Sequence, residues 1–360
     1  NSKKKWFPYN KGGAYRKWYG NISLVIKYDS KNRDLLKNTG NHCASEDCYF
    51  KEAMTWTDLT SGHLGARFLP KGNIFDIAGH CAYPVIKNGH LLALGMFNNK
   101  FINTISKVIN ATMHFQPGDF RKLPFPKIFN NSDSVIDLVR KCIALAKLDW
   151  DSYETSWDFT ENPIIRMGQP NLEQAFNTWQ QQNANAVAEM KRLEEENNKL
   201  FIDAYGLQDE LTPDVPDEQI TLTRADREKD SQRLVSYALG CMMGRYSLDE
   251  PGLIYAHAGN QDFDASRYQK FPADADGIIP LTEMHWFEDD ATHRIQEFLT
   301  AVWGKDTLDA NMQWLAESLD KKASETAEDT IRRYLASKFY KDHMQTYKKR
   351  PIYWLFSSGK

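Results

Sequence analysis

The chain has 360 residues, 41% of them hydrophobic, and a formal net charge of −3. This size allows two or three domains with ordinary cores. No apolar stretch approaches the roughly 20 residues that cross a bilayer, and the first residues lead into no signal-peptide core, so nothing marks the chain as membrane-bound or secreted. The five cysteines are few and unevenly spread, which predicts a cytoplasmic protein with free thiols rather than a disulfide framework.

The net charge hides an asymmetry. Residues 1–130 carry 19 Lys and Arg against 8 Asp and Glu, whereas residues 131–360 carry 26 against 40. A polyanion is therefore attracted to the first third of the chain and repelled by the rest.

The segment WFPYNKGGAYRKWYGN, residues 6–21, combines basic residues with six aromatic residues around Gly12 and Gly13. Cations attract phosphate, aromatic rings can stack on bases, and glycines allow close approach of the backbone. We expect this basic block to meet nucleic acid, although a basic loop over an aromatic cluster would have the same composition. The residues expected to hold phosphates are Lys3, Lys4, Lys5, Lys11, Arg16 and Lys17.

Residues 1–130 show short extended stretches, such as 23–28 and 73–77, broken by Gly, Pro and Asn, which predicts a strand-rich domain. Apolar residues recurring every three to four positions predict one helix over 89–110. Long polar side chains near turns are suited to reading base edges in the major groove. The candidates here are Arg67, Lys71, Asn73, His80, Thr112, His114, Gln116, Arg121 and Lys122.

Residues 131–210 are predicted to be helical. A heptad seam over 172–204, with Asn183 and Asn197 on it, indicates one helix about 50 Å long. Two interpretations remain open: a coiled-coil-like spacer between functional parts, or a long helix packed within its own domain.

A Pro- and acid-rich segment, 206–221, resembles a linker before a mainly helical region, 211–360. Thr223 to Asp226 has the form of a capping box. Acidic residues at 288–290 are expected in the first turn of a helix that Gly304 ends, and a final helix is expected over 327–347. The predicted class is thus α+β, with a strand-rich domain, a helical coiled-coil-like spacer and a mainly helical C-terminal domain.

Six ordered blocks carry a family resemblance: residues 5–21, 60–79 (TSGHLGARFLPKGNIFDIAG), 110–126 (NATMHFQPGDFRKLPFP), 235–253 (VSYALGCMMGRYSLDEPGL), 276–281 and 348–360 (KKRPIYWLFSSGK). With these blocks the chain resembles the C-terminal portion of PglX, the family of adenine-specific DNA methyltransferases in bacterial BREX phage-defence systems. It is more distantly similar to large type II restriction-modification enzymes. The last block is expected to continue beyond Lys360 in the family.

Motifs for chemistry are missing from the sequence. The Asn-Pro-Pro-aromatic segment that grips a flipped adenine has only Asn162-Pro163-Ile164-Ile165 as a look-alike, which lacks the stacking ring. Glu189-Met190-Lys191 matches half of a nuclease motif and is expected to be a solvated helix face. His42, Cys43, Cys48, His80 and Cys81 have poor spacing for zinc. We therefore expect no catalytic, cofactor-binding or metal-binding residues in this chain.

The resemblance implies that residues 1–130 form the target recognition domain of an enzyme that methylates the N6 amine of adenine with S-adenosylmethionine. We expect the chain to bind double-stranded DNA without transferring a methyl group itself. Other phage-defence proteins are possible partners by resemblance. Two alternatives remain open: the specificity part of a restriction-modification enzyme, and a protein-interaction scaffold of a defence complex.

Overall fold

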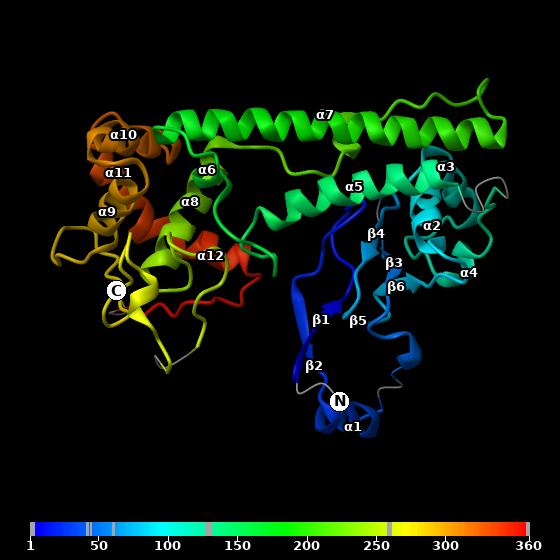
Figure 1. The fold of residues 1–360 in the computed structure, drawn as a ribbon, viewed down its shortest axis with the longest axis horizontal. Coiled ribbons are helices and arrows are strands. Elements are labelled where there is room, and N and C mark those ends of the chain that lie inside the picture. Colours follow the sequence, from blue (N-terminus) through cyan, green and yellow to red (C-terminus); the bar gives the residue numbers. More distant parts are fainter. Residues whose placement is uncertain are drawn as a thin grey trace. The chain divides into compact units, whose positions relative to one another are not determined.

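The computed structural model describes residues 4–40, 43, 45–59, 62–126, 132–257 and 261–357. The chain divides into two compact units. The N-terminal unit contains residues 1–150 and 186–223, and the C-terminal unit contains residues 151–185 and 224–360 (Figure 1). The fold is mixed α+β and mainly helical, which confirms the expected class.

Two small three-stranded sheets lie in the N-terminal unit. In the first, with order β2-β1-β5, the central strand is antiparallel to β2 and parallel to β5. The second, with order β4-β3-β6, is antiparallel throughout. The strands are β1 (Trp6–Asn10), β2 (Leu24–Lys27), β3 (Ala53–Thr57), β4 (Ala66–Leu69), β5 (Ile74–Phe75) and β6 (Gly79–Ala82). A helix, α1 (Ser30–Asn38), and a 3₁₀ turn (Glu46–Cys48) connect β2 to β3.

The central strand β3 is buried on both faces. Met54 and Trp56 lie in the hydrophobic core, with 0% and 1% exposure. Thr55 faces the other way, as strand alternation requires, and accepts a hydrogen bond of 2.7 Å from Asn10 Nδ2. The end of β1 therefore covers the polar face of the second sheet.

The single helix expected over 89–110 is wrong. The structure has two helices, α2 (Gly89–Phe97) and α3 (Lys100–Ile109). Asn98 exchanges two hydrogen bonds with the backbone of Ala66, and Asn99 caps α3 by accepting from the backbone N–H of Ile102. The Asn98 amide thus pairs with the backbone of Ala66, and the Asn99 amide caps the first turn of α3. A continuous helix would leave these backbone groups without their partners.

The helices α4 (Pro117–Phe120), α5 (Asp133–Asp151), α6 (Pro163–Arg166) and α7 (Leu172–Tyr205) confirm that residues 132–205 are mainly helical. The 34-residue helix α7 contributes residues up to Asn185 to the C-terminal unit and the rest to the N-terminal unit. The expected spacer is therefore divided between the two units and is not a unit of its own.

The heptad seam of α7 packs inside the protein. Its first half, including Leu172 and Phe176, belongs to the core of the C-terminal unit, and Met190 and Leu193 belong to the core of the N-terminal unit. Each polar seam position binds backbone: Asn183 Oδ1 accepts from Ala225 N at 2.8 Å, and Asn197 Nδ2 donates to Gly95 O at 2.9 Å. The structure thus favours the interpretation of a long helix packed within its own domains.

The acid-rich segment 206–221 is packed and does not form a free linker. Val215, Ile220 and nearby Leu222 are each at most 5% exposed and lie in the core of the N-terminal unit. The next helix, α8 (Arg227–Met242), is capped by Asp226, which accepts from Lys229 N. The expected capping box at Thr223 is wrong, because Thr223 instead bonds Asp149 through its backbone N–H and its hydroxyl.

The C-terminal unit is built from helices around an aromatic core that includes Tyr237, Phe298 and Tyr334. After α8 come α9 (Ala291–Trp303), α10 (Leu308–Ser318), α11 (Ala327–Tyr334), a π-helical turn (Leu335–Phe339) and α12 (Tyr340–Thr346). Short 3₁₀ turns occupy Asp217–Gln219, Ala265–Arg267 and Lys305–Thr307. Gly304 ends α9 as expected, whereas the acidic residues 288–290 lie before its first turn, with Asp290 as the N-cap. In the described part of the chain, no helix combines the length and apolarity needed to cross a membrane.

Candidate nucleic-acid interface

Residues 110–122, here called the recognition turn, follow α3, include the short helix α4, and form an exposed segment with a buried anchor. Phe115 is 3% exposed, and its backbone N–H donates to Asp58 O at 2.9 Å. The indole of Trp56 donates to Phe115 O at 2.8 Å and stacks on Phe120 with ring centroids 5.2 Å apart. These contacts hold the base of the turn against β3.

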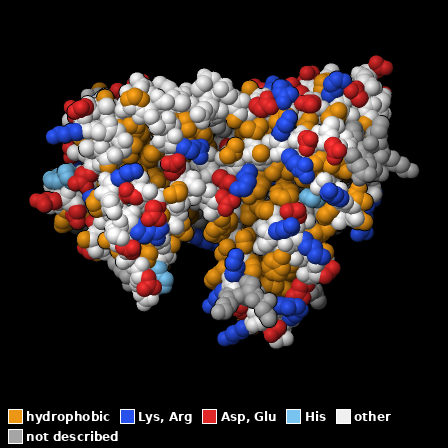
Figure 2. All heavy atoms as spheres, in the orientation of Figure 1, with side chains coloured by type: hydrophobic (Ala, Val, Ile, Leu, Met, Phe, Trp, Pro, Cys, Tyr) orange, Lys and Arg blue, Asp and Glu red, His pale blue; other side chains and the backbone are white. Residues whose placement is uncertain are grey.

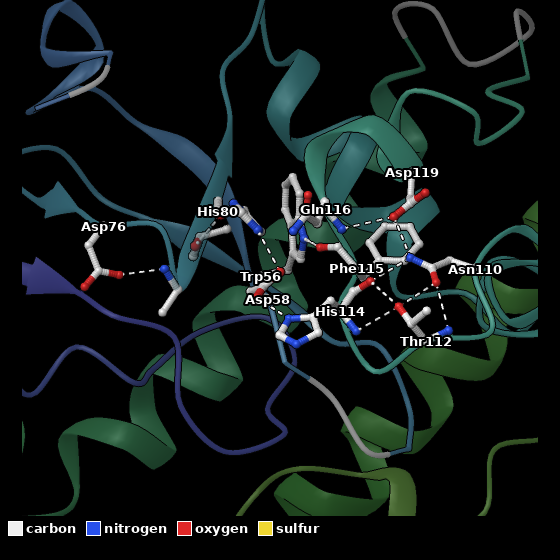
Figure 3. A network of polar contacts seen from close by, with 12 residues as sticks. Trp56, Asp58, Asp76, His80, Asn110, Thr112, His114, Phe115, Gln116 and Asp119 are labelled. Carbon is white, nitrogen blue, oxygen red and sulfur yellow. Dashed lines mark hydrogen bonds and ion pairs between the residues drawn. The ribbon is translucent and has the colours of Figure 1, made fainter. Parts of the chain in front are cut away.

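Asn110 braces the recognition turn from inside (Figure 3). Its Nδ2 donates to His114 O and to Asp119 Oδ2, both at 2.6 Å, while its Oδ1 accepts from the backbone N–H and the hydroxyl of Thr112. The Asn110 amide therefore uses both donors and its acceptor within one short segment. Such a saturated network fixes the backbone of an exposed turn.

Asp58 joins two of the expected base readers. Its Oδ1 lies 3.1 Å from His80 Nε2, and its Oδ2 lies 2.6 Å from His114 Nδ1 (Figure 3). Burial by itself raises the pKa of the Asp58 carboxyl, but the hydrogen bonds from His114 and His80 outweigh it and hold the pKa below its ordinary value. The His80 side chain is 10% exposed and that of His114 is 56% exposed, so only His114 is open to a partner.

The outer face of the recognition turn is polar and open. Thr112, Gln116 and Arg121 are exposed, and the Lys122 side chain, 3.2 Å from Asp119 Oδ1, is 63% exposed. An amide, an imidazole, a hydroxyl and two cations on one braced turn supply the groups that pair base edges and phosphates. The structure thus brings together five of the sequence-predicted site residues, Thr112, His114, Gln116, Arg121 and Lys122, with His80 beneath them.

We expect Asp58→Asn to lower the stability of the N-terminal unit by about 1.5–3 kcal/mol at pH 7, because a hydrogen bond to a charged acceptor is worth about that much and the Asn amide keeps only one oxygen to accept. The folded-state pKa of Asp58 is depressed. Its contribution is therefore complete above the ordinary aspartate pKa of about 3.9 and is lost as the pH falls through the lower folded value. Urea unfolding at pH 7 and pH 3 checks this. A difference between variant and parent that stays the same at both pH values would contradict it.

The basic block is largely internal. Arg16 Nη1 lies 3.1 Å from Asp149 Oδ2, and its guanidinium stacks over Trp150. Lys17 is 3% exposed and forms an ion pair with Glu194, which also accepts from Trp18 Nε1 at 2.7 Å. The expected phosphate contacts of Arg16 and Lys17 are thus replaced by contacts inside the N-terminal unit.

The glycine pair of the block approaches its own chain. At Gly12, with φ of +74°, an added Cβ would lie 2.6 Å from Ala78 O and 3.0 Å from the Thr57 methyl group. A side chain there would clash with backbone as well as strain the left-handed conformation. The glycines were expected to let the backbone approach nucleic acid. In the structure Gly12 instead allows this loop to pack closely on the second sheet.

Two further expected base readers are buried. Arg67 is 1% exposed; its Nη2 donates weakly to Thr57 Oγ1 at 3.4 Å, and burial lowers its pKa to about 10. Asn73 is 3% exposed and donates to Pro70 O at 3.0 Å. Neither side chain reaches the surface, so both are left out of the interface proposed below.

The remaining expected cations lie on the surface. Lys4 and Lys5 are exposed, the Lys11 side chain is 58% exposed at 3.8 Å from Asp76, and that of Lys71 is 77% exposed. Lys3 lies outside the described residues. Figure 2 shows hydrophobic side chains at the surface over β1 and β5 with Lys and Arg around them. Trp6, the first residue of β1, is 55% exposed, and Ile77, two residues after β5, is 85% exposed.

The sequences that resembled catalytic motifs have structural roles. Asn162 is 3% exposed and caps α6 by accepting from Ile164 N at 3.0 Å. Glu189 pairs with Arg192 at 2.8 Å and Lys191 pairs with Asp217 at 2.7 Å, both on exposed helix surface. All five cysteines are free, and within the described ranges no group of three or more His, Cys, Asp and Glu could hold a metal ion. His42 lies outside those ranges.

The chain is similar in sequence to known adenine-specific methyltransferases. Over 99% of its length the chain is 39% identical to the adenine-specific methyltransferase BrxX of Escherichia coli O9:H4 (strain HS). Over the same share it is 38% identical to the adenine-specific methyltransferase PglX of Lacticaseibacillus casei (strain Zhang). The chain is homologous to one segment of the BrxX and PglX methyltransferases. It spans 31% and 30% of their lengths, and no family model matches it.

The homology to BrxX and PglX confirms the resemblance inferred from the six sequence blocks. Sequence reasoning missed the residues that hold the recognition turn in place, namely Asp58, which joins two histidines, and Asn110, which braces the turn. A signal for Asn110 was present, since Asn-x-Thr before Pro-Gly-Asp is typical of a side chain that bonds backbone two residues ahead. Nothing near Asp58 in the sequence points to His114, which lies 56 residues away.

Proposed function

We propose that this chain is the DNA-recognition portion of an adenine-specific DNA methyltransferase and that the recognition turn contacts double-stranded DNA. The observation that carries the proposal is an exposed turn, braced by Asn110 and Asp58, in the basic third of a chain homologous to BrxX and PglX. A rigid turn loses little conformational entropy on binding, which suits a surface that must distinguish sequences.

The exposed side chains divide by chemistry. Gln116 can pair an adenine edge and the hydroxyl of Thr112 can pair several bases, while His114 offers an imidazole held by Asp58. Arg121 and Lys122 supply charge next to these groups and can bind either guanine or phosphate. Lys4, Lys5, Lys11 and Lys71 are exposed cations suited to phosphates elsewhere on the duplex, which positions the protein without specifying sequence.

The finer enzymology is part of the same proposal. The whole protein would methylate the N6 amine of adenine with S-adenosylmethionine in the cytoplasm, as a component of a BREX phage-defence system with other defence proteins as partners. This chain would select the site and hold the duplex, and the residues that bind the cofactor and the flipped adenine would lie elsewhere in the protein. Support for this comes from the names of the homologues and from the basic first third of the chain.

The double variant Arg121→Gln, Lys122→Gln tests the interface. Each phosphate contact contributes about −0.9 to the slope of log affinity against log salt, so losing two contacts should make the slope shallower by about 1.8. Affinity at low salt should fall about tenfold or more. Fluorescence anisotropy of a labelled duplex at several salt concentrations measures both quantities.

The matched control is Lys305→Gln, Lys322→Gln, which removes the same charge from exposed positions of the C-terminal unit. The control should keep the parent slope. Equal losses in the two double variants would mean that only net charge matters, and the proposed interface would then be wrong.

A further inference from the structure

The connection between β6 and α2 carries three consecutive exposed apolar residues, Pro84, Val85 and Ile86, here called the apolar tip (Figure 1). Val85 is 100% exposed and Ile86 is 46% exposed. Single apolar residues are common on protein surfaces. A run of three, however, is unfavourable in water unless it has a function. The apolar tip is therefore a candidate contact surface.

The apolar tip is held in a fixed shape. Gly89 N donates to Ile86 O at 3.0 Å, which closes the turn, and Asn88 caps α2 in the left-handed conformation with φ of +59°. A Cβ added at Gly89 would lie 3.1 Å from Ile86 Cγ1 and 3.7 Å from Pro84 Cβ. The side chains on either side of Val85 thus fold back over Gly89, and Val85 is presented at the end of a braced turn.

The charge around the apolar tip suits a polyanion. Lys87 follows the tip directly, is exposed, and makes no ion pair in the part of the chain that the structure describes. At the start of α2, burial lowers the pKa of His90 and Glu52 opposes this shift. Glu52 Oε1 in turn lies 3.9 Å from Lys71 Nζ, so its charge is balanced. An apolar tip beside an unpaired lysine, in the basic third of the chain, is complementary to duplex DNA, where phosphates border the apolar faces of the bases.

The apolar tip is close enough to the recognition turn to meet the same duplex. His80 shares Asp58 with His114 of the recognition turn. Because Val85 follows His80 by five residues, their Cα atoms are at most about 18 Å apart. One helical turn of duplex DNA measures about 34 Å. A duplex at the recognition turn can therefore reach the apolar tip within one helical turn.

We propose that the apolar tip is a wedge that enters the duplex between base pairs when the recognition turn binds DNA. The proposal rests on the proposed function of the chain. Apolar side chains inserted between base steps partly unstack the bases and kink the duplex. An enzyme that modifies a base inside a duplex must take that base out of the stack. The apolar tip supplies part of this unstacking.

Fluorescence anisotropy with two labelled duplexes of the same random sequence, one fully paired and one with a central mismatch, tests the wedge. Because a mismatched base is easier to unstack, the parent should bind the mismatched duplex about three- to tenfold more tightly. Val85→Ser should weaken binding to the paired duplex about tenfold, since the burial of a valine side chain is lost. Its preference for the mismatch should fall below about twofold. Because this substitution changes no charge, the slope of log affinity against log salt should stay that of the parent.

Ile278→Ser is the matched control, because Ile278 is a β-branched apolar residue that is 67% exposed and belongs to the C-terminal unit. It should bind both duplexes like the parent. Since Val85 is completely exposed, Val85→Ser should fold, and an unchanged midpoint of urea unfolding verifies this. Equal affinity of the parent for the two duplexes, or a mismatch preference that Val85→Ser retains, would overturn the proposal.

The same titrations separate the wedge from the recognition turn. A shallower salt slope in Arg121→Gln, Lys122→Gln together with a full mismatch preference in Val85→Ser would mean that the recognition turn is right and the wedge is wrong. The parent slope in the Arg121 and Lys122 variant, with the preference lost in Val85→Ser, would mean the reverse. Absence of binding to either duplex by the parent would overturn both proposals.

Discussion

Lys17→Met is expected to lower the free energy of unfolding of the N-terminal unit by about 3–5 kcal/mol. Lys17 and Glu194 form an ion pair whose side chains are 4% and 3% exposed. Removing one partner of a buried pair leaves the other charge without compensation, and this cost is typically several kcal/mol. The Trp18 indole donates to the same carboxylate, and without Lys17 that carboxylate is no longer held in place to accept this hydrogen bond.

The effect of Lys17→Met should depend on pH. Burial raises the pKa of the Glu194 carboxyl, and without the opposing Lys17 charge it should rise further. The folded variant then binds a proton that the unfolded chain releases, so stability is greatest below the ordinary glutamate pKa and falls as the pH rises through the folded value. The loss should therefore be larger at pH 8 than at pH 5.

Urea unfolding followed by tryptophan fluorescence measures this loss. The double variant Lys17→Met, Glu194→Gln should recover most of the stability, because the uncompensated charge is gone and the Gln carbonyl can still accept from Trp18. Lys11→Met, at a 58% exposed side chain, should change stability by less than about 0.5 kcal/mol. A loss below 1 kcal/mol in Lys17→Met would show that the ion pair is solvated in solution.

The internal contacts of Arg16 and Lys17 also determine which variant can test DNA binding. Neutralising Arg16 and Lys17 would remove the contacts to Asp149, Trp150 and Glu194 that hold α5 and α7 against the N-terminal segment. Weaker DNA binding in such a variant would follow from misfolding alone. The exposed pair Arg121 and Lys122 is the better probe of the interface.

Asp290→Ala is expected to destabilise the C-terminal unit by about 3–5 kcal/mol. Asp290 is completely buried and caps α9, with Oδ1 accepting from Thr292 N and His293 N at 2.9 Å. Its Oδ2 accepts from Arg332 Nη1 at 2.8 Å and from His285. Alanine removes the cap, worth about 0.5–2 kcal/mol, and leaves Arg332, which is 6% exposed, without this buried partner.

Hydrogen exchange of the α9 amides and urea unfolding measure the effect. Asp290→Asn should cost less than Asp290→Ala, because the amide oxygen still caps the helix. Burial by itself raises the pKa of Asp290, but hydrogen bonds from His293, Arg332 and His285 hold it below its ordinary value. The charge-dependent stability is thus present above about pH 3.9 and lost as the pH falls through the lower folded value.

Asp289→Ala is the neighbouring control, since Asp289 is exposed. It should leave both the α9 exchange rates and the unfolding curve close to those of the parent. Loss of protection in Asp289→Ala equal to that in Asp290→Ala would show that general acidity before α9, and not the buried contact, stabilises the helix.

Local signals in the sequence were enough for the elements with strong periodicity or clear ends. The heptad spacing over 172–204 predicted α7, and Gly304 predicted the end of α9. These features act within a few residues, through side-chain periodicity and capping, so they can be recognised in the sequence without knowledge of the fold. The order of six sequence blocks also predicted the homology to BrxX and PglX.

Contacts between segments that are distant in the sequence could not be predicted from the sequence. Asn98 and Asn99 divided the expected helix because Ala66, 32 residues away, supplies partners for Asn98. Lys17 looks like a surface cation in sequence, yet Glu194 lies 177 residues ahead and pairs with it inside the N-terminal unit. The seam of α7 likewise gave no indication of whether another chain or its own cores would cover it.

The candidate interface also combines local features, which the sequence predicts, with contacts between distant segments, which it does not predict. The sequence by itself determined that a helical pattern ends near residue 110 and that polar and basic side chains follow it up to residue 122, because helical periodicity and side-chain chemistry can be recognised from nearby residues. Only the tertiary structure decided that His114 and His80 meet at Asp58, that Arg67 and Asn73 are buried, and that Lys17 faces Glu194. Local hydrogen bonds are specified by neighbours in sequence, whereas burial and pairing of charges depend on which distant segments the folded core brings together.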